Sequence, residues 1–123
     1  MIRVSVSNIF YDSGRIKISD VNAPFSVLVE GHAGGIKGSD TFCAAVSALG
    51  MTMVLTLAST DGLEQKVEQR DGFLKTEAVV ELRESVIRRT EIILEFFITG
   101  MAELARIEPQ RVAVLFNDIN SNV

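Results

Sequence analysis

The first thirty residues alternate between hydrophobic and polar side chains in the manner of strands that bury one face. Residues 2–7 show this period-two pattern, and the strand they begin is expected to run to Phe10 or Tyr11. The turn residues Asp12-Ser13-Gly14 then favour a hairpin into a second extended segment that ends at Glu30. Because Ala23-Pro24 interrupts this segment, it is either one long strand with a break or two pieces.

The remainder of the chain alternates between helical and extended patterns. Two further strands, 64–69 and 73–80, flank an Asp71-Gly72 hairpin signal. Helical periodicity predicts helices over 41–59 and 82–106, and a last strand starts at Val112. The predicted order is therefore ββαββαβ, which favours an α+β fold in which a mostly antiparallel sheet packs against two helices.

The second predicted helix carries more apolar surface than one face needs. In addition to its main stripe, it has a second one formed by Ile87, Ile92, Phe96 and Ile98. A domain of this size does not obviously cover both stripes. Two explanations stay open at this point, a homodimer interface and a helix that is buried on two sides within one chain.

Composition narrows the class of protein. A chain of 123 residues with 47% hydrophobic content fits a single domain over 1–123, with a polar tail from about Asn117. The net charge of -4 argues against nonspecific binding to nucleic acid, although a basic protein partner is compatible with it. One cysteine and no apolar signal core make the cytoplasm the expected compartment. The uncharged stretch 41–60 is rich in Ser and Thr, so we expect a buried helix and no membrane partner.

Candidate chemistry is concentrated in one stretch, from Gly31 to Ser47, which holds the single histidine and the single cysteine of the chain. Cys43 is predicted in the first turn of a helix, where free amides and the helix dipole favour a thiolate. His32 lies before a loop that contains Gly34, Gly35 and Gly38, and it could act as the general base and acid. A buried core cysteine and a structural histidine are the alternatives.

Two further residues of this stretch are possible supporting groups. Asp40 could orient His32 as a third catalytic member, but its simpler role is the N-cap of the helix. Ser47 lies one turn beyond Cys43 and could donate a hydrogen bond near the sulfur or bond to its own backbone. One Cys and one His do not make a metal site, and the glycines fit no nucleotide-binding pattern, so we expect no metal and no cofactor.

At these residues the chain resembles the bacterial ribosomal-processing cysteine proteases, the Prp family. The similarity extends to about Arg106 and includes the hairpin around Asp71 and the long final helix. The motif matches, in order, are Gly31-His32-Ala33, Gly38, Asp40 and Cys43-Ala44-Ala45-Val46-Ser47.

The resemblance implies a protease in which Cys43 is the nucleophile and His32 the general base. It also implies removal of a short amino-terminal extension from protein twenty-seven of the large ribosomal subunit, a homodimer, and a loop at 33–42 that rearranges when substrate binds. Two regions depart from the family. The segment 11–24 is longer, which could alter the peptide groove, and the tail 112–123 extends further. The rival hypotheses are a non-catalytic ribosome-assembly or binding module of the same fold and a thiol enzyme of other chemistry, such as acyl transfer.

Overall fold

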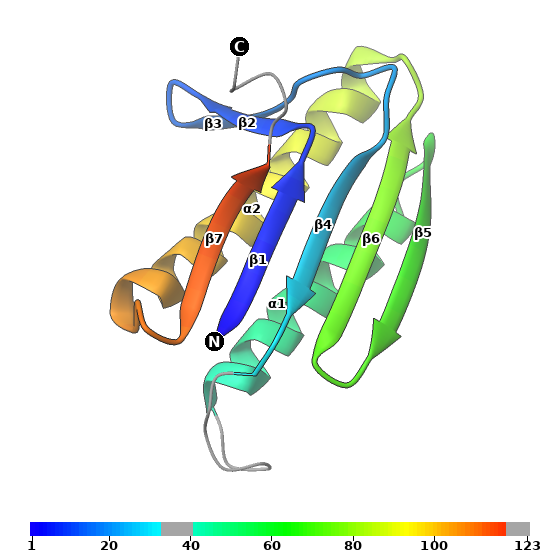
Figure 1. Ribbon diagram of the computed structural model, residues 1–123. Helices are drawn as coiled ribbons and strands as arrows, with labels where there is room; N and C mark the ends of the chain where they lie inside the picture. Colours follow the sequence, from blue (N-terminus) through cyan, green and yellow to red (C-terminus); the bar gives the residue numbers. More distant parts are fainter. Residues whose placement is uncertain (33–40, 118–123) are drawn as a thin grey trace.

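The computed structural model describes residues 1–32 and 41–117, and most of its strands form one five-stranded sheet (Figure 1). The spatial order is β5-β6-β4-β1-β7, and every neighbouring pair is antiparallel except β1 and β7, which are parallel. The strands of this sheet are β1 (Ile2–Ser7), β4 (Phe25–Glu30), β5 (Leu63–Arg70), β6 (Phe73–Val80) and β7 (Val112–Asn117).

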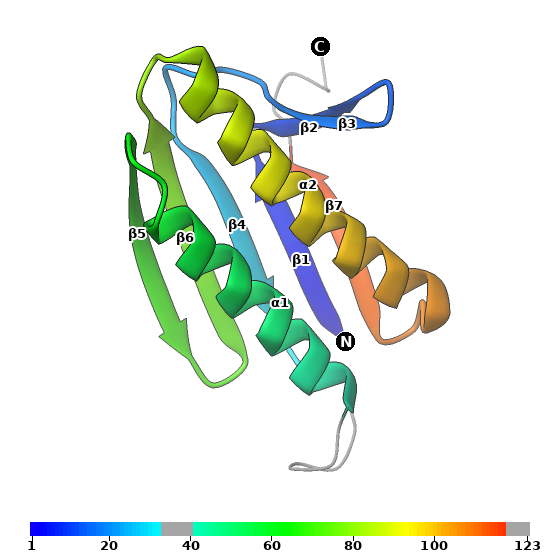
Figure 2. The same ribbon diagram turned by 180° about the vertical axis from the view of Figure 1, so that it is seen from behind.

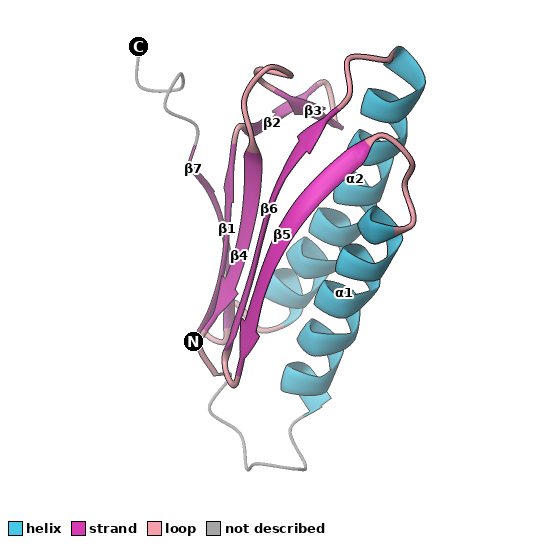
Figure 3. Cartoon of the chain, turned by 90° about the vertical axis from the view of Figure 1, so that its right-hand side faces the viewer, coloured by secondary structure: helices cyan, strands magenta, loops and turns pink. Residues whose placement is uncertain are grey.

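Two helices, α1 (Thr41–Ala58) and α2 (Glu84–Ile107), pack on the same face of this sheet (Figures 2 and 3). Among the described residues, no helix covers the other face. The α+β class with a mostly antiparallel sheet against two helices is therefore confirmed, and both helices lie within two residues of their predicted bounds.

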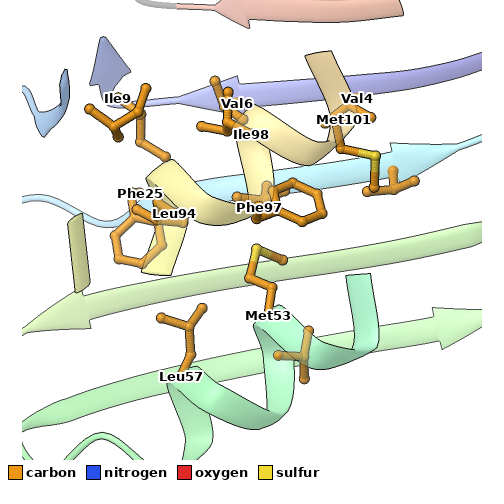
Figure 4. Packing of buried hydrophobic residues seen from close by; sticks show 14 of the residues in the cluster. Val4, Val6, Ile9, Phe25, Met53, Leu57, Leu94, Phe97, Ile98 and Met101 are labelled. Carbon is orange, nitrogen blue, oxygen red and sulfur yellow. The ribbon is translucent and has the colours of Figure 1, made fainter. Parts of the chain in front are cut away.

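The core lies between the sheet and the helices, and the alternation of the strands explains it. The helix-facing positions of β1 and β4 are almost fully buried, whereas the residues between them are exposed or half-buried. Figure 4 shows apolar side chains of α2 and of α1 meeting those of the strands in this layer. The contributing side chains include Val4, Val6, Phe25, Met53, Leu57, Leu94, Phe97, Ile98 and Met101.

The first predicted strand is divided at Asn8, which adopts a left-handed backbone conformation with φ 64°. Its side-chain amide donates to the carbonyl oxygens of Asp20 (2.8 Å) and Ala23 (3.1 Å), and its Oδ1 accepts from the Asp20 N–H. After this break, β2 (Ile9–Asp12) pairs with β3 (Arg15–Ile18) as a separate hairpin. Of the two alternatives for the second predicted segment, two pieces is the one observed, and the element order becomes ββββαββαβ.

This hairpin is attached to α2 through two carboxylates, which accept the hydrogen bonds that a further strand beside β3 would otherwise accept. The backbone N–H of Ile16 donates to Glu95 at 3.0 Å, and that of Ile18 donates to Glu91 at 2.9 Å. Glu95 also accepts a hydrogen bond from the Arg15 guanidinium at 3.0 Å. The edge amides of β3 are thereby satisfied without further strand pairing.

The second apolar stripe of α2 is only partly covered by the chain itself. Ile98 is buried and Ile87 packs against the core, but Ile92 is 48% exposed and Phe96 is 72% exposed. Burial on two sides within one chain is therefore wrong for Ile92 and Phe96.

The long apolar helix α1 meets the length and composition criteria for crossing a membrane. A core helix meets the same criteria, and the sheet-facing side of α1 belongs to the core. Its buried residues are Val46, Gly50, Met53, Val54 and Leu57.

Candidate active site

Three segments meet at one end of the sheet: the residues after β4, the first turns of α1, and the β5–β6 turn (Figure 1). Together they enclose an open cavity of about 150 Å³. Both His32 and Cys43 line it, as does Ser47. The structure therefore brings the predicted pair to one site. The remaining lining residues are Ile2, Val29, Gly31, Val46, Met51, Gln69, Arg70, Asp71, Gly72, Phe73 and Leu74.

The position of His32 depends on two glycines. Gly31 has φ 106°, and a side chain there would collide with the carbonyl oxygen of Met1. The Gly31 N–H donates to the Gly72 carbonyl at 2.9 Å, which fixes the end of β4 against the β5–β6 turn. Gly72, with φ 70°, lies directly against the imidazole, since a methyl group at its α-carbon would be 2.6 Å from His32 Nε2. Only glycine leaves room for the ring here.

Cys43 lies in the first turn of the described helix α1 and is half-buried. Amides at the amino end of a helix favour a negative charge, so a thiolate at Cys43 has a suitable environment. The neighbouring Phe42 ring lies under the Arg111 guanidinium, 4.6 Å from its centroid. Arg111 in turn accepts a hydrogen bond from the Ile2 N–H through its carbonyl, at 2.8 Å. The turn that carries Cys43 is thus in contact with Arg111, the residue before β7, which is itself bonded to β1.

The other predicted site residues have different outcomes. Ser47 lines the cavity one turn beyond Cys43 and is exposed. Asp40, Gly34, Gly35 and Gly38 lie outside the described residues.

The β5–β6 turn is a part of the site that sequence reasoning did not place there. Asp71-Gly72 was predicted as a turn, but its contact with His32 depends on long-range pairing of β4 with β6. Met51 and Gln69 were likewise not predicted to line the site. The available signal was indirect, because the segment around Asp71 is part of the family resemblance.

The effect of the 11–24 segment on the groove that receives the peptide stays a prediction, and no residue of this segment lines the cavity that holds His32 and Cys43. The hairpin β2–β3 lies at the end of the sheet opposite to the end of β4 and the start of α1 (Figure 1). The reason is topological: β1 carries the chain to the far end before Asn8 breaks the strand, and β4 brings it back.

The chemistry that the cavity offers is that of a thiol and an imidazole. Among the described residues, no cluster of three or more His, Cys, Asp or Glu side chains is arranged to hold a metal ion. A thiol near the amino end of a helix and an imidazole lining the same cavity form an arrangement suited to attack on a carbonyl.

Comparisons with solved structures give three informative similarities. A crystal structure of the essential ribosomal processing protease Prp from Staphylococcus aureus, with a covalently linked product peptide, matches with a TM-score of 0.72 and 18% identity, over 95% of this chain and 100% of that one. The same protease with a substrate peptide matches with a TM-score of 0.67, also at 18% identity and over the same shares. A crystal structure of a Streptococcus mutans protein matches with a TM-score of 0.65 and 25% identity, over 96% of this chain and 95% of that one.

The two Staphylococcus aureus matches, at 18% identity, are evidence of a shared fold only. No curated protein matched the chain. A family model described as cysteine protease Prp matches residues 1–113, which is nearly the whole sequence. The chain therefore belongs to the Prp family of cysteine proteases.

Proposed function

We propose that this protein is an endopeptidase that removes the amino-terminal extension of protein twenty-seven of the large ribosomal subunit, with Cys43 as nucleophile and His32 as general base and acid. One observation carries the proposal: the single cysteine and the single histidine of a Prp-family chain line the same open cavity. We place this activity in the cytoplasm, with no membrane, nucleic acid or cofactor involved.

The catalytic cycle follows from the two groups. His32 takes the proton from the Cys43 thiol, and the thiolate sulfur attacks the carbonyl carbon of the scissile peptide bond. Backbone amides of the first helical turn stabilise the negative oxygen of the tetrahedral intermediate. The imidazolium then protonates the leaving amine as the C–N bond breaks, which leaves a thioester on Cys43. Water, deprotonated by His32, attacks the thioester and releases the carboxylate product and the thiol.

The substrate assignment rests on two supports of different weight. The Staphylococcus aureus protease with this fold is described as a ribosomal processing protease and is seen with a substrate peptide. In addition, the chain has a net charge of -4, which favours encounter with a basic ribosomal protein. Charge alone is a weak discriminator, so the first support is the stronger one.

The decisive experiment compares the parent protein with Cys43→Ser and His32→Ala on a purified precursor that carries the extension. Mass spectrometry should show one cleavage within the amino-terminal region by the parent and none by either variant. Binding of the precursor by all three proteins without cleavage would instead indicate a binding module. Rapid alkylation of Cys43 with no peptide cut would indicate a thiol enzyme of other chemistry.

We also propose that the protein is a homodimer formed through the surface between α1 and α2. An apolar groove of about 260 Å³ lies there, and the exposed Ile92 and Phe96 are at its edge. Exposed aromatic residues of this kind are typical of interfaces. Phe96→Glu should convert the dimer to a monomer in sedimentation velocity, whereas Leu115→Glu, at a 44% exposed residue of β7, should not.

A further inference from the structure

The cavity that holds Cys43 and His32 is bordered in part by the edge strand of the sheet. β5 is the terminal strand, and among the described residues no other strand pairs with its outer edge (Figure 3). The last residues of β5, Gln69 and Arg70, line the same cavity as Cys43 and His32. A peptide that leaves the nucleophile on this side therefore meets an unpaired strand edge.

The hairpin geometry determines which backbone groups of β5 are free. Arg70 and Phe73 flank the two-residue turn and form its hydrogen-bonded pair, and such pairs alternate along an antiparallel ladder. The Gly62 carbonyl accepts from the Glu81 N–H at 2.7 Å, which agrees with this alternation at the other end of the hairpin. The N–H and C=O groups of Val67 and Gln69 consequently point away from β6, towards the open edge.

The side chain of Gln65 bridges α1 and β5 on the side of Val67 that is farther from the cavity. Gln65 donates to the Val54 carbonyl of α1 at 2.8 Å and accepts from the buried Thr76 hydroxyl at 2.6 Å. Between this bridge and the cavity, Val67 is 41% exposed although it is on the helix-facing side of the strand. Met51 of α1 lines the cavity itself. The accessible stretch thus runs from Val67 to the cavity, which is room for about three or four extended residues.

We propose, as an extension of the proposed function, that the substrate binds as an added strand along the edge of β5 and pairs with the backbone of Val67 and Gln69. An extended peptide added to a free sheet edge obtains affinity from main-chain hydrogen bonds and specificity from alternate side chains. The side chains directed towards α1 meet Met51 and Val67, so the substrate class is an extended peptide with an apolar residue on this flank of the scissile bond.

The first test uses the parent protein and modified substrates, so that folding of the protein is not in question. Successive backbone amides of a synthetic peptide spanning the cleavage site are N-methylated one at a time, and kcat/KM is measured for each. Strand addition predicts that methylation of alternate amides on one flank lowers kcat/KM about tenfold, the effect of one lost hydrogen bond, with little effect between them. Equal sensitivity of neighbouring amides would overturn the proposal.

A second test removes one free amide from the protein. Val67→Pro eliminates an N–H that makes no bond to β6, and proline is tolerated at such edge positions. Val67→Thr is the comparison variant, because it keeps the backbone amide and the β-branched shape and changes only the polarity of the side chain. Val67→Pro should raise KM about tenfold while the melting temperature and the rate of Cys43 alkylation stay at parental values. Val67→Thr keeps the backbone pairing and should raise KM less than Val67→Pro does, and equal KM values for these two variants would contradict strand addition.

Binding separates this proposal from the proposed function. The same Val67 variants are made in a Cys43→Ser background, and their affinity for the fluorescein-labelled peptide is measured by anisotropy. A parent that does not cleave would refute the protease, yet weaker binding by Val67→Pro than by Val67→Thr would still support strand addition. A parent that cleaves, with equal binding by all Val67 variants, would refute strand addition and leave the protease intact.

Discussion

Substitution of Gly72 by alanine should separate the position of the imidazole from the stability of the fold. Gly72 has φ 70°, a conformation that is unfavourable for alanine by about 1–2 kcal/mol. The new methyl group would lie 2.6 Å from His32 Nε2, where an ordinary contact is at least 3.4 Å. The end of the imidazole therefore has to move by about 0.8 Å to restore that contact. Because His32 is exposed, this movement adds little to the loss of stability.

The expected loss of activity is much larger than the loss of stability. A misplacement of about 1 Å at a catalytic group can lower the reaction rate by a factor on the order of 100. We expect Gly72→Ala to lower kcat/KM by about this factor on the precursor peptide, with a melting temperature reduced by roughly 4–8 °C. Steady-state cleavage followed by mass spectrometry gives the first value, and circular dichroism gives the second.

Gly14→Ala is the matched control for this prediction. Gly14 has φ 79° and also occupies the second position of a two-residue hairpin turn, but nothing lies within 4 Å of the position of its added methyl group. It should lose a similar amount of stability and keep parental activity. If Gly72→Ala also keeps parental kcat/KM, contact with Gly72 is not what positions His32, and the reasoning fails.

Two further predictions concern the hairpin β2–β3, which lies far from the site. The hydrogen bond from the Ile16 N–H, and then the one from the Arg15 guanidinium, hold the pKa of Glu95 below its ordinary value of 4.5. The ionised carboxylate thus stabilises the fold above pH 4.5, and this contribution is lost as the pH falls through the lowered pKa of the folded state. The melting temperature of the parent should therefore drop more steeply below pH 4.5 than that of Glu95→Gln, and parallel curves would contradict this assignment. Asn8→Ala removes the bonds to Asp20 and should lower the free energy of unfolding by about 1–3 kcal/mol in urea titrations, with kcat/KM unchanged; a fall in kcat/KM would show that the two ends of the sheet are coupled.

Much of the fold could be predicted because its signals are local. The alternation in β1, the Asp71-Gly72 turn and the helical periodicity of α2 each act over a few residues, and all three elements form as expected. The division of the first strand at Asn8 could not be predicted in the same way. It depends on an asparagine side chain that binds backbone groups twelve and fifteen residues further on, which no local pattern records.

Most of the candidate site could not be predicted either, because its residues also meet through long-range contacts. Residue type alone selected Cys43 and His32, since each is the single member of its kind. The residues around them could not be selected, because Gly72, Met51 and Gln69 reach the cavity through strand pairing and helix docking. Their side chains are ordinary for a turn, a helix and an edge strand, and only the three-dimensional arrangement gives them a role.

The arrangement of the sheet also explains why a hairpin in the β1–β4 connection does not reach the candidate site. Antiparallel pairing of β1 with β4 places the β1–β4 connection at one end of the sheet and His32 at the other. The hairpin in that connection lies at the far end, where Asn8, Glu91 and Glu95 accept hydrogen bonds from backbone N–H groups of the connection. The end that holds His32 is constrained instead by close contacts at Gly31 and Gly72, which leave no space for a side chain. Changes near these two glycines should therefore alter catalysis, whereas changes in the hairpin should alter stability alone.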